Sequence, residues 1–240
     1  MKKTNIGRFA NPRRALALIK WIEPIAAVVA VVTIAIGLYT GLVTSPDDYQ
    51  QGSSVRIMYL HVPAAWMAMF CYTSMAVAAF VGLVWKHIVA ELYAKAAAPL
   101  GAAFTFICLV TGSLWGKPMW GTWWVWDARL TSVLILFFLY LGYMALVDAF
   151  DDEQKGINAG AFLLLIGVIN IPIIKFSVDW WNTLHQPASL MRFAKPALDN
   201  AMLVPLLTMG IGFTALFTAL VCIRLKTEIA RRKQMVRDER

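Results

Sequence analysis

The segment from Trp115 to Arg129 contains half of the ten tryptophans in the chain. It reads WGKPMWGTWWVWDAR and lies between two long hydrophobic runs. An indole has an apolar body and one N–H donor, so tryptophan gathers at the water boundary of membrane proteins. Indoles grouped with an Asp and an Arg would also form a platform for a flat aromatic ligand. The composition is compatible with a heavy interfacial belt and with a ligand surface.

Two of the three histidines stand in similar local sequence. His61 occurs in YLHVPAAW and His185 in WWNTLHQP, so a proline, Pro63 or Pro187, follows each by two positions. Proline restricts the backbone around it and would help to hold each imidazole in place. A single histidine at a membrane boundary is usually an ordinary polar residue at headgroup level. Two histidines on the side of the tryptophan-rich segment favour ligand binding.

Haem binding is the chemistry that would use two neutral imidazoles and a broad aromatic surface. Haem iron accepts axial histidine nitrogens, so we expect His61 and His185 to ligate it. The propionates need cationic partners, and the guanidinium fork of arginine matches a carboxylate, which makes Arg56 and Arg129 the candidates. Arg56 could equally be a loop charge, and Arg129 a snorkelling residue or an ion-pair partner of Asp127.

The remaining candidates for haem contact come from the tryptophan-rich segment. The indoles expected to line one face of the porphyrin are those of Trp115, Trp120, Trp123, Trp124 and Trp126. Asp127 could order the loop or accept a hydrogen bond from an indole N–H.

These residues must be positioned by membrane helices, because 60% of the chain is hydrophobic, only 15% is charged and the mean hydropathy is +0.64. Several stretches exceed the roughly 18 uncharged apolar residues that indicate a membrane-spanning helix. The sequence predicts an all-α, polytopic membrane protein with one domain over 1–240, since no linker or long polar insert divides it. The six expected spans are near residues 22–43, 58–85, 96–115, 130–149, 157–177 and 201–223.

The distribution of Lys and Arg predicts the orientation of these spans. Sixteen of the 22 lie in the two terminal regions and in the connections near 86–95 and 150–156. The positive-inside rule assigns these regions, with both termini, to the cytoplasm. It leaves segments 44–57, 115–130 and 178–200 outside, with His61 at the outer end of its span. The formal charge of +8 then reflects topology and attraction to anionic lipid headgroups, not nucleic-acid binding.

Other metal chemistry fits this pattern less well. A structural zinc site normally uses four Cys or His ligands, and Cys71, Cys108 and Cys222 lie singly in predicted spans, as buried packing residues do. A transmembrane electron carrier would be expected to hold histidine pairs inside the bundle. His61 and His185 are both predicted at one rim, which favours loading and release of haem.

The tryptophan-rich segment carries a family resemblance. It resembles the WWD signature of the haem-handling proteins of cytochrome c biogenesis. The residues that match are WG at 115–116, Trp120 and WWVWDARLT at 123–131. With the HVP element at 61–63, the WW to HQP element at 180–187 and six spans in 240 residues, the whole chain resembles the CcmC family of the bacterial cytochrome c maturation system. Larger relatives with this signature, CcmF and CcsA, have more spans.

The resemblance implies a function and a set of partners. In this family, haem b is held at the periplasmic face of the inner membrane between the WWD segment and two axial histidines, which map onto His61 and His185. The haem is then presented to the chaperone CcmE, in a complex with the ATP-binding subunit CcmA, the membrane subunit CcmB and the small protein CcmD. This chain has no phosphate-binding GxxxxGK[ST] loop and no evident catalytic residue. We therefore expect a haem-binding scaffold and not an enzyme.

Two other classes of function stay open. A pump that moves haem through the bundle predicts polar or ionisable residues at mid-span, and Asn170 is among the few candidates. A quinol-linked redox enzyme predicts haem that exchanges electrons with quinol.

Overall fold

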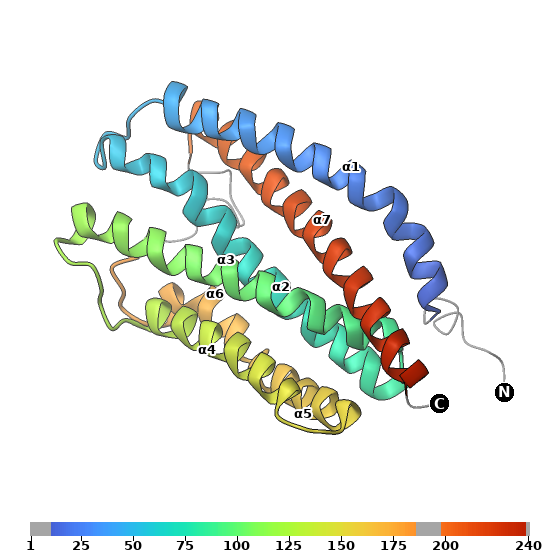
Figure 1. The fold of residues 1–240 in the computed structure, drawn as a ribbon. Helices are drawn as coiled ribbons and strands as arrows, with labels where there is room; N and C mark the ends of the chain where they lie inside the picture. Colours follow the sequence, from blue (N-terminus) through green and yellow to red (C-terminus); the bar gives the residue numbers. More distant parts are fainter. Residues whose placement is uncertain (1–10, 186–197, 239–240) are drawn as a thin grey trace.

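The computed structural model describes residues 11–185 and 198–238, and nearly all of them are helical (Figure 1). The helices are α1 (Pro12–Tyr39), α2 (Met58–Trp85), α3 (Ile88–Trp120), α4 (Ala128–Asp148), α5 (Glu153–Gly167), α6 (Asn170–Trp180) and α7 (Asn200–Asp238). A π-helical turn, η2 (Thr40–Thr44), and a 3-10 turn, η3 (Ser53–Ile57), connect α1 to α2. The predicted all-α fold is confirmed.

Within the described part of the chain, six helical segments are long and apolar enough to cross a membrane, which agrees with the predicted number. They are Pro12–Thr44, Ser53–Trp85, Ile88–Trp120, Ala128–Asp148, Glu153–Trp180 and Asn200–Met235. The helix α2 coincides with its predicted span, but α1, α3 and α7 extend beyond theirs. Hydropathy marks only the part of a helix that lies in lipid, whereas backbone hydrogen bonding continues into polar sequence. The largest difference for function is in α3, which continues to Trp120 and makes part of the tryptophan-rich segment helical.

Side chains in the connections define where several helices begin. Asn11 accepts a hydrogen bond from the backbone N–H of Arg13 (2.9 Å), and Pro12 occupies the first helical position of α1. His87, the histidine outside the predicted site, caps α3 by accepting the N–H of Ala90 at Nδ1 (3.1 Å). His87 is thus accounted for by a structural role.

The fifth span is interrupted between α5 and α6. Pro172, at the third position of α6, has no N–H to donate to the carbonyl of Val168, and that carbonyl accepts the N–H of Ile171 (3.0 Å) in a tighter turn. Just after the break, the buried side chain of Asn170 donates to the backbone carbonyl of Ser132 on α4 (2.8 Å). Asn170, the polar residue noted for a pump, is therefore used in helix packing.

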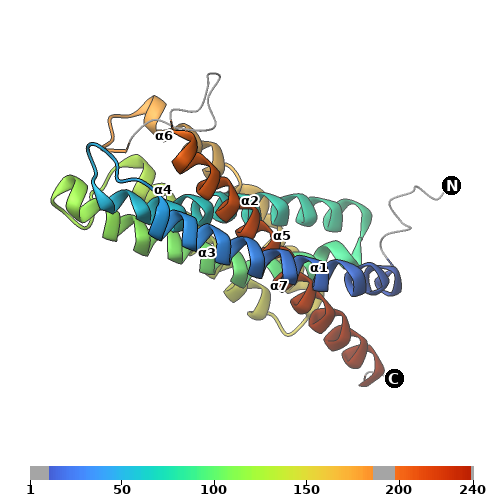
Figure 2. The ribbon, with the colours of Figure 1, turned by 90° about the horizontal axis from the view of Figure 1, so that it is seen from above.

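The helices form an elongated bundle with two distinct ends. α7 lies between α1 and the pair α2–α3, while α4, α5 and α6 lie on the far side of that pair (Figures 1 and 2). The start of α1 and the end of α7 share what we call the terminal end, together with the turn between α2 and α3. The opposite, site end contains residues 40–57, 116–128 and 180–185.

Ion pairs connect the helices at the terminal end. The ammonium of Lys95 on α3 lies 3.2 Å from Glu153 and 3.7 Å from Glu228. The remaining pairs there are Arg232 with Glu91 (3.5 Å) and Lys226 with Glu23 (2.5 Å). These contacts attach the charged end of α7 to α1 and α3, and Lys95 connects α3 to α5 as well.

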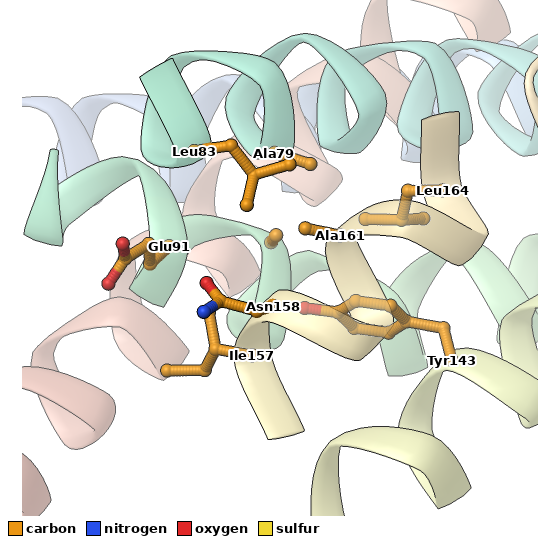
Figure 3. A pocket seen from close by; sticks show the side chains of 9 residues that line it. Ala79, Leu83, Glu91, Tyr143, Ile157, Asn158, Ala161 and Leu164 are labelled. Carbon is orange, nitrogen blue, oxygen red and sulfur yellow. The ribbon is translucent and has the colours of Figure 1, made fainter. Parts of the chain in front are cut away.

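A small cavity lies near the same end, between α2, α3, α4 and α5 (Figure 3). Its walls are mostly apolar, with Glu91 and Asn158 as polar members. The cavity offers about 10 Å³, which is near the lower limit for a single water molecule. It is therefore a packing feature and not a cofactor site.

Close helix packing at Gly101 leads to a stability prediction. The phenol ring of Tyr140 on α4 lies directly against Gly101, and its hydroxyl donates to the carbonyl of Ala68 on α2 (2.7 Å). A methyl group at Gly101 would displace that ring, so Gly101→Ala is expected to destabilise the protein by about 1–3 kcal/mol. Thermal unfolding in detergent would measure the change.

Gly142→Ala is the matched control, because its added methyl would meet only Leu163, at 3.5 Å. It should be neutral or stabilising by up to about 1 kcal/mol, the difference in helix propensity. Equal unfolding temperatures for the two variants would contradict the proposed role of Gly101.

Candidate functional site

The tryptophan-rich segment is divided between a helix and a short connection. Trp115 and Trp120 belong to the last turns of α3, which ends at Gly121. Gly121 has a φ of 75°, a left-handed conformation that glycine adopts readily, and its N–H returns to the carbonyl of Lys117 (3.1 Å). Asp127 begins α4 by accepting the N–H of Leu130 at 2.8 Å. The tryptophans Trp123, Trp124 and Trp126 lie on the connection between these two points.

His61 lies on the first turns of α2, with its imidazole against α3. Its Nδ1 is 3.1 Å from the carbonyl of Cys108 and 3.1 Å from the hydroxyl oxygen of Thr111. A carbonyl can only accept, and the Thr111 hydroxyl donates its proton to the carbonyl of Ile107 (2.6 Å). Nδ1 of His61 must therefore carry the proton. This tautomer leaves the lone pair of Nε2 available to a metal.

Trp115 lies beside His61. The two rings meet edge to face, with centroids 5.7 Å apart and an interplanar angle of 75°. The indole Nε1 of Trp115 donates to the side-chain oxygen of Gln51 at 2.9 Å. Gln51 therefore fixes the orientation of this indole from the connection between α1 and α2.

His185 lies on the other side of the same helix end. Its ring centroid is 4.9 Å from that of Trp120, and its Nδ1 is 3.6 Å from a carboxylate oxygen of Asp127. The backbone N–H of His185 donates to the hydroxyl of Thr183 (3.1 Å), and that hydroxyl donates to the same carboxylate. Asp127 thus connects the start of α4 to the segment that carries His185.

The charge of Asp127 follows from these contacts. Burial by itself would raise the pKa of the carboxyl group. The contacts from His185, Thr183 and the N–H of Leu130 outweigh burial and lower its pKa to about 2. Asp127 is therefore an anion at neutral pH and favours a proton on the nitrogen of His185 that faces it. The Nε2 of His185 would then be the metal-binding atom.

The structure thus brings together residues that are far apart in the sequence. His61 contacts Trp115, and His185 contacts Trp120, at the site end of α3. The role of the two imidazoles as iron ligands stays a prediction.

Two of the other indoles of this segment are largely open, whereas Trp124 is half-buried. Trp123 is 54% exposed and Trp126 is 75% exposed, which leaves apolar ring surface available to a ligand. Trp124 contacts Trp126 edge to face, with centroids 5.5 Å apart. The ammonium of Lys117 lies 5.8 Å from the centre of the Trp123 ring, at a distance that permits a cation–π interaction.

Arg129 makes its contacts with α6. Its Nε donates to the hydroxyl of Ser177 (3.1 Å), and one terminal nitrogen lies 3.4 Å from the carbonyls of Ile174 and Lys175. Arg129 therefore connects α4 to α6 near the site. Its proposed contact with a propionate stays a prediction.

Arg56 makes its contacts with the connection that precedes it. The guanidinium donates to the carbonyls of Leu42 (2.9 Å) and Ser45 (3.4 Å) and pairs with the carboxylate of Asp47 (3.1 Å). This geometry matches the simpler interpretation of Arg56 as a loop charge. The Nε of Arg56 has no partner among the described residues, and a propionate contact by this arginine stays a prediction.

The three cysteines are free and buried, as predicted for packing residues. Within residues 11–185 and 198–238, no group of three His, Cys, Asp or Glu side chains could hold a metal ion.

Sequence reasoning did not identify Gln51, Thr183 or Gly112 as site residues. Gln51 and Thr183 lie in segments that were expected to be exterior, but their partners could not be read from spacing. Gly112 precedes Gly116 by one helical turn, and this spacing was a usable signal. Pro187, expected to restrain His185, lies outside the described residues.

Comparison with known proteins gives a consistent family relationship. The model of the family described as CcmC, Heme exporter protein C, matches residues 5–240. A Heme exporter protein C of Bradyrhizobium diazoefficiens is 58% identical over 224 residues, which cover 93% of this chain and 85% of the relative. The Escherichia coli K12 protein of that name is 52% identical over 222 residues, covering 92% and 89%. A ccmC-like mitochondrial protein of Marchantia polymorpha, named for cytochrome c biosynthesis, is 49% identical and covers 75% of each chain.

Proposed function

The chain belongs to the Heme exporter protein C family, and on that premise we propose that it binds haem b at the site end and delivers it to the chaperone CcmE. The role in haem handling for cytochrome c maturation follows from the family. The observation that carries the proposal is the placement of His61 and His185 against Trp115 and Trp120 of one helix end.

The chemistry of the site residues fits haem. His61 has its Nδ1 proton committed to acceptors on α3, so its Nε2 is free to bind iron. The exposed rings of Trp123 and Trp126 supply apolar surface of the kind that a porphyrin face buries. When bound, haem supplies the iron and the vinyl groups for transfer, while the residues of this chain bind and orient it.

The distribution of charge between the two ends of the bundle supports a role in a membrane complex. We infer that the terminal end faces the cytoplasm, because most Lys and Arg residues lie there, and that the site end faces the periplasm. The chain would then act in the bacterial inner membrane with CcmA, CcmB and CcmD. It serves as a haem-binding scaffold, and ATP hydrolysis is expected in CcmA.

The test is co-purification of the chain with CcmE, with and without haem. We expect the two proteins to co-purify when haem is present and to separate when haem synthesis is blocked. In this family the chaperone is understood to take haem covalently on a histidine, so a CcmE variant that lacks this histidine provides the control for transfer. Equal recovery of CcmE in the absence of haem would contradict a haem-dependent delivery complex.

A further inference from the structure

The imidazole of His61 sits in a depression formed by four residues of α3. Cys108 and Thr111 accept its Nδ1 proton, the Trp115 ring meets its edge, and Gly112 lies beneath it. These four positions are spaced i, i+3, i+4 and i+7, so they share one face of the helix. α3 therefore holds the imidazole on several sides.

Because Gly112 has no side chain, the imidazole ring of His61 can lie directly against α3 at this position. A Cβ atom at Gly112 would lie 3.0 Å from Cε1, 3.5 Å from Nδ1 and 4.0 Å from Nε2 of His61. A contact of 3.0 Å between carbon atoms is well inside their normal separation. The ring could withdraw only by lengthening its hydrogen bonds to Cys108 and Thr111. A side chain at this position would therefore displace the imidazole or change its tilt.

Gly116 has the same relation to Trp120, one turn further along α3. A Cβ atom there would lie 3.0 and 3.1 Å from two atoms of the Trp120 ring and 3.6 Å from the carbonyl of Thr122. Trp120 in turn contacts His185, with ring centroids 4.9 Å apart. Gly112 thus lies against the imidazole of His61, and Gly116 lies against Trp120, which contacts the imidazole of His185.

We infer that Gly112 and Gly116 are positioning residues that let His61 and Trp120 lie close to α3, and so set the separation of His61 and His185. This inference rests on the proposed function, because the separation matters only if both imidazoles bind one iron. Gly112 acts directly on His61, whereas Gly116 acts on His185 through Trp120. The effect of a side chain should therefore be larger at Gly112.

The experiment compares Gly112→Ala and Gly116→Ala with the control Gly142→Ala, using purified haem-loaded protein. The readouts are absorption and electron paramagnetic resonance, which report the iron ligands, and haem affinity. We expect Gly112→Ala to convert a large part of the low-spin signal to high spin and to weaken haem binding about tenfold or more. Gly116→Ala should have a smaller effect of the same kind, and Gly142→Ala should resemble the wild type.

A mutant cycle with His61→Ala tests whether Gly112 acts through His61. In the His61→Ala background, Gly112→Ala should change haem affinity little, because the displaced ring is absent. A wild-type spectrum for Gly112→Ala, or a full additional loss in the double variant, would overturn the inference.

Two further outcomes are separable. If Gly112→Ala does not fold, Gly116→Ala decides the question, and an unchanged spectrum there overturns the inference. If the wild type and Gly142→Ala themselves lack six-coordinate haem, the proposed function fails, and the inference fails with it.

Discussion

Replacement of either His61 or His185 with alanine is expected to abolish the six-coordinate, low-spin absorption of the haem-loaded protein. Each single variant should leave one axial ligand and give a high-spin spectrum, and the double variant should retain little haem. Loss of a partner hydrogen-bonded to a metal ligand typically lowers metal affinity 10- to 100-fold. Loss of a ligand itself should exceed about 100-fold. Haem titration monitored by absorption measures both effects.

His87→Ala is the matched control for these variants. His87 lies at the terminal end, where it caps α3 by accepting the N–H of Ala90. Its removal should cost about 1 kcal/mol of stability and leave the haem spectrum unchanged. If both site variants keep the wild-type six-coordinate spectrum, His61 and His185 are not the iron ligands.

Substitution of Asp127 should separate its effect on stability, as the cap of α4, from its effect on haem affinity, through His185. Asp127 caps α4 through Leu130 and also faces the Nδ1 of His185. Asp127→Asn keeps the cap, because asparagine caps helices as well as aspartate does, but it removes the charge beside the imidazole. We expect haem affinity to fall about tenfold with little change in stability. Asp127→Ala should show the same loss of affinity and, in addition, lose about 1 kcal/mol of stability.

The cap of α5 offers the comparison for Asp127. Asp152 accepts the N–H groups of Gln154 and Lys155 far from the site. Asp152→Ala should therefore lower the unfolding temperature and leave haem binding unaffected. Haem affinity and unfolding temperature, measured on the same preparations, distinguish the two roles. An unchanged affinity in Asp127→Asn would show that the carboxylate does not act on His185.

The membrane architecture was predictable because hydropathy and charge act over whole helices. Six spans follow from long apolar runs, and the shared end of His61 and the tryptophans follows from the number of spans between them. Local contacts were not predictable in the same way. The loop contacts of Arg56 depend on the backbone carbonyls of Leu42 and Ser45. Every residue has a backbone carbonyl, so residue types do not reveal where these acceptors lie.

The extent of α3 also escaped prediction, for a physical reason. Lys117 and Pro118 resemble the start of a loop, yet Pro118, like Pro99, lies inside α3, which ends at Trp120 with Gly121 as its C-cap. Trp115 and Trp120 consequently have fixed helical positions. The contacts of Gly112 and Gly116 with His61 and Trp120 follow from that continuation.

The ion pairs of the bundle are unevenly distributed. Four ion pairs join α1, α3, α5 and α7 at the terminal end, including those of Lys95 and Arg232, whereas the pair of Arg56 with Asp47 lies at the site end. The site end depends more on indole edges and on hydrogen bonds to carbonyls. Dissolved electrolyte weakens attraction between charges, most strongly for exposed pairs such as Lys226 with Glu23, and leaves ring contacts nearly untouched. Raising the ionic strength should therefore weaken helix contacts at the terminal end more than at the site end, which holds the imidazoles.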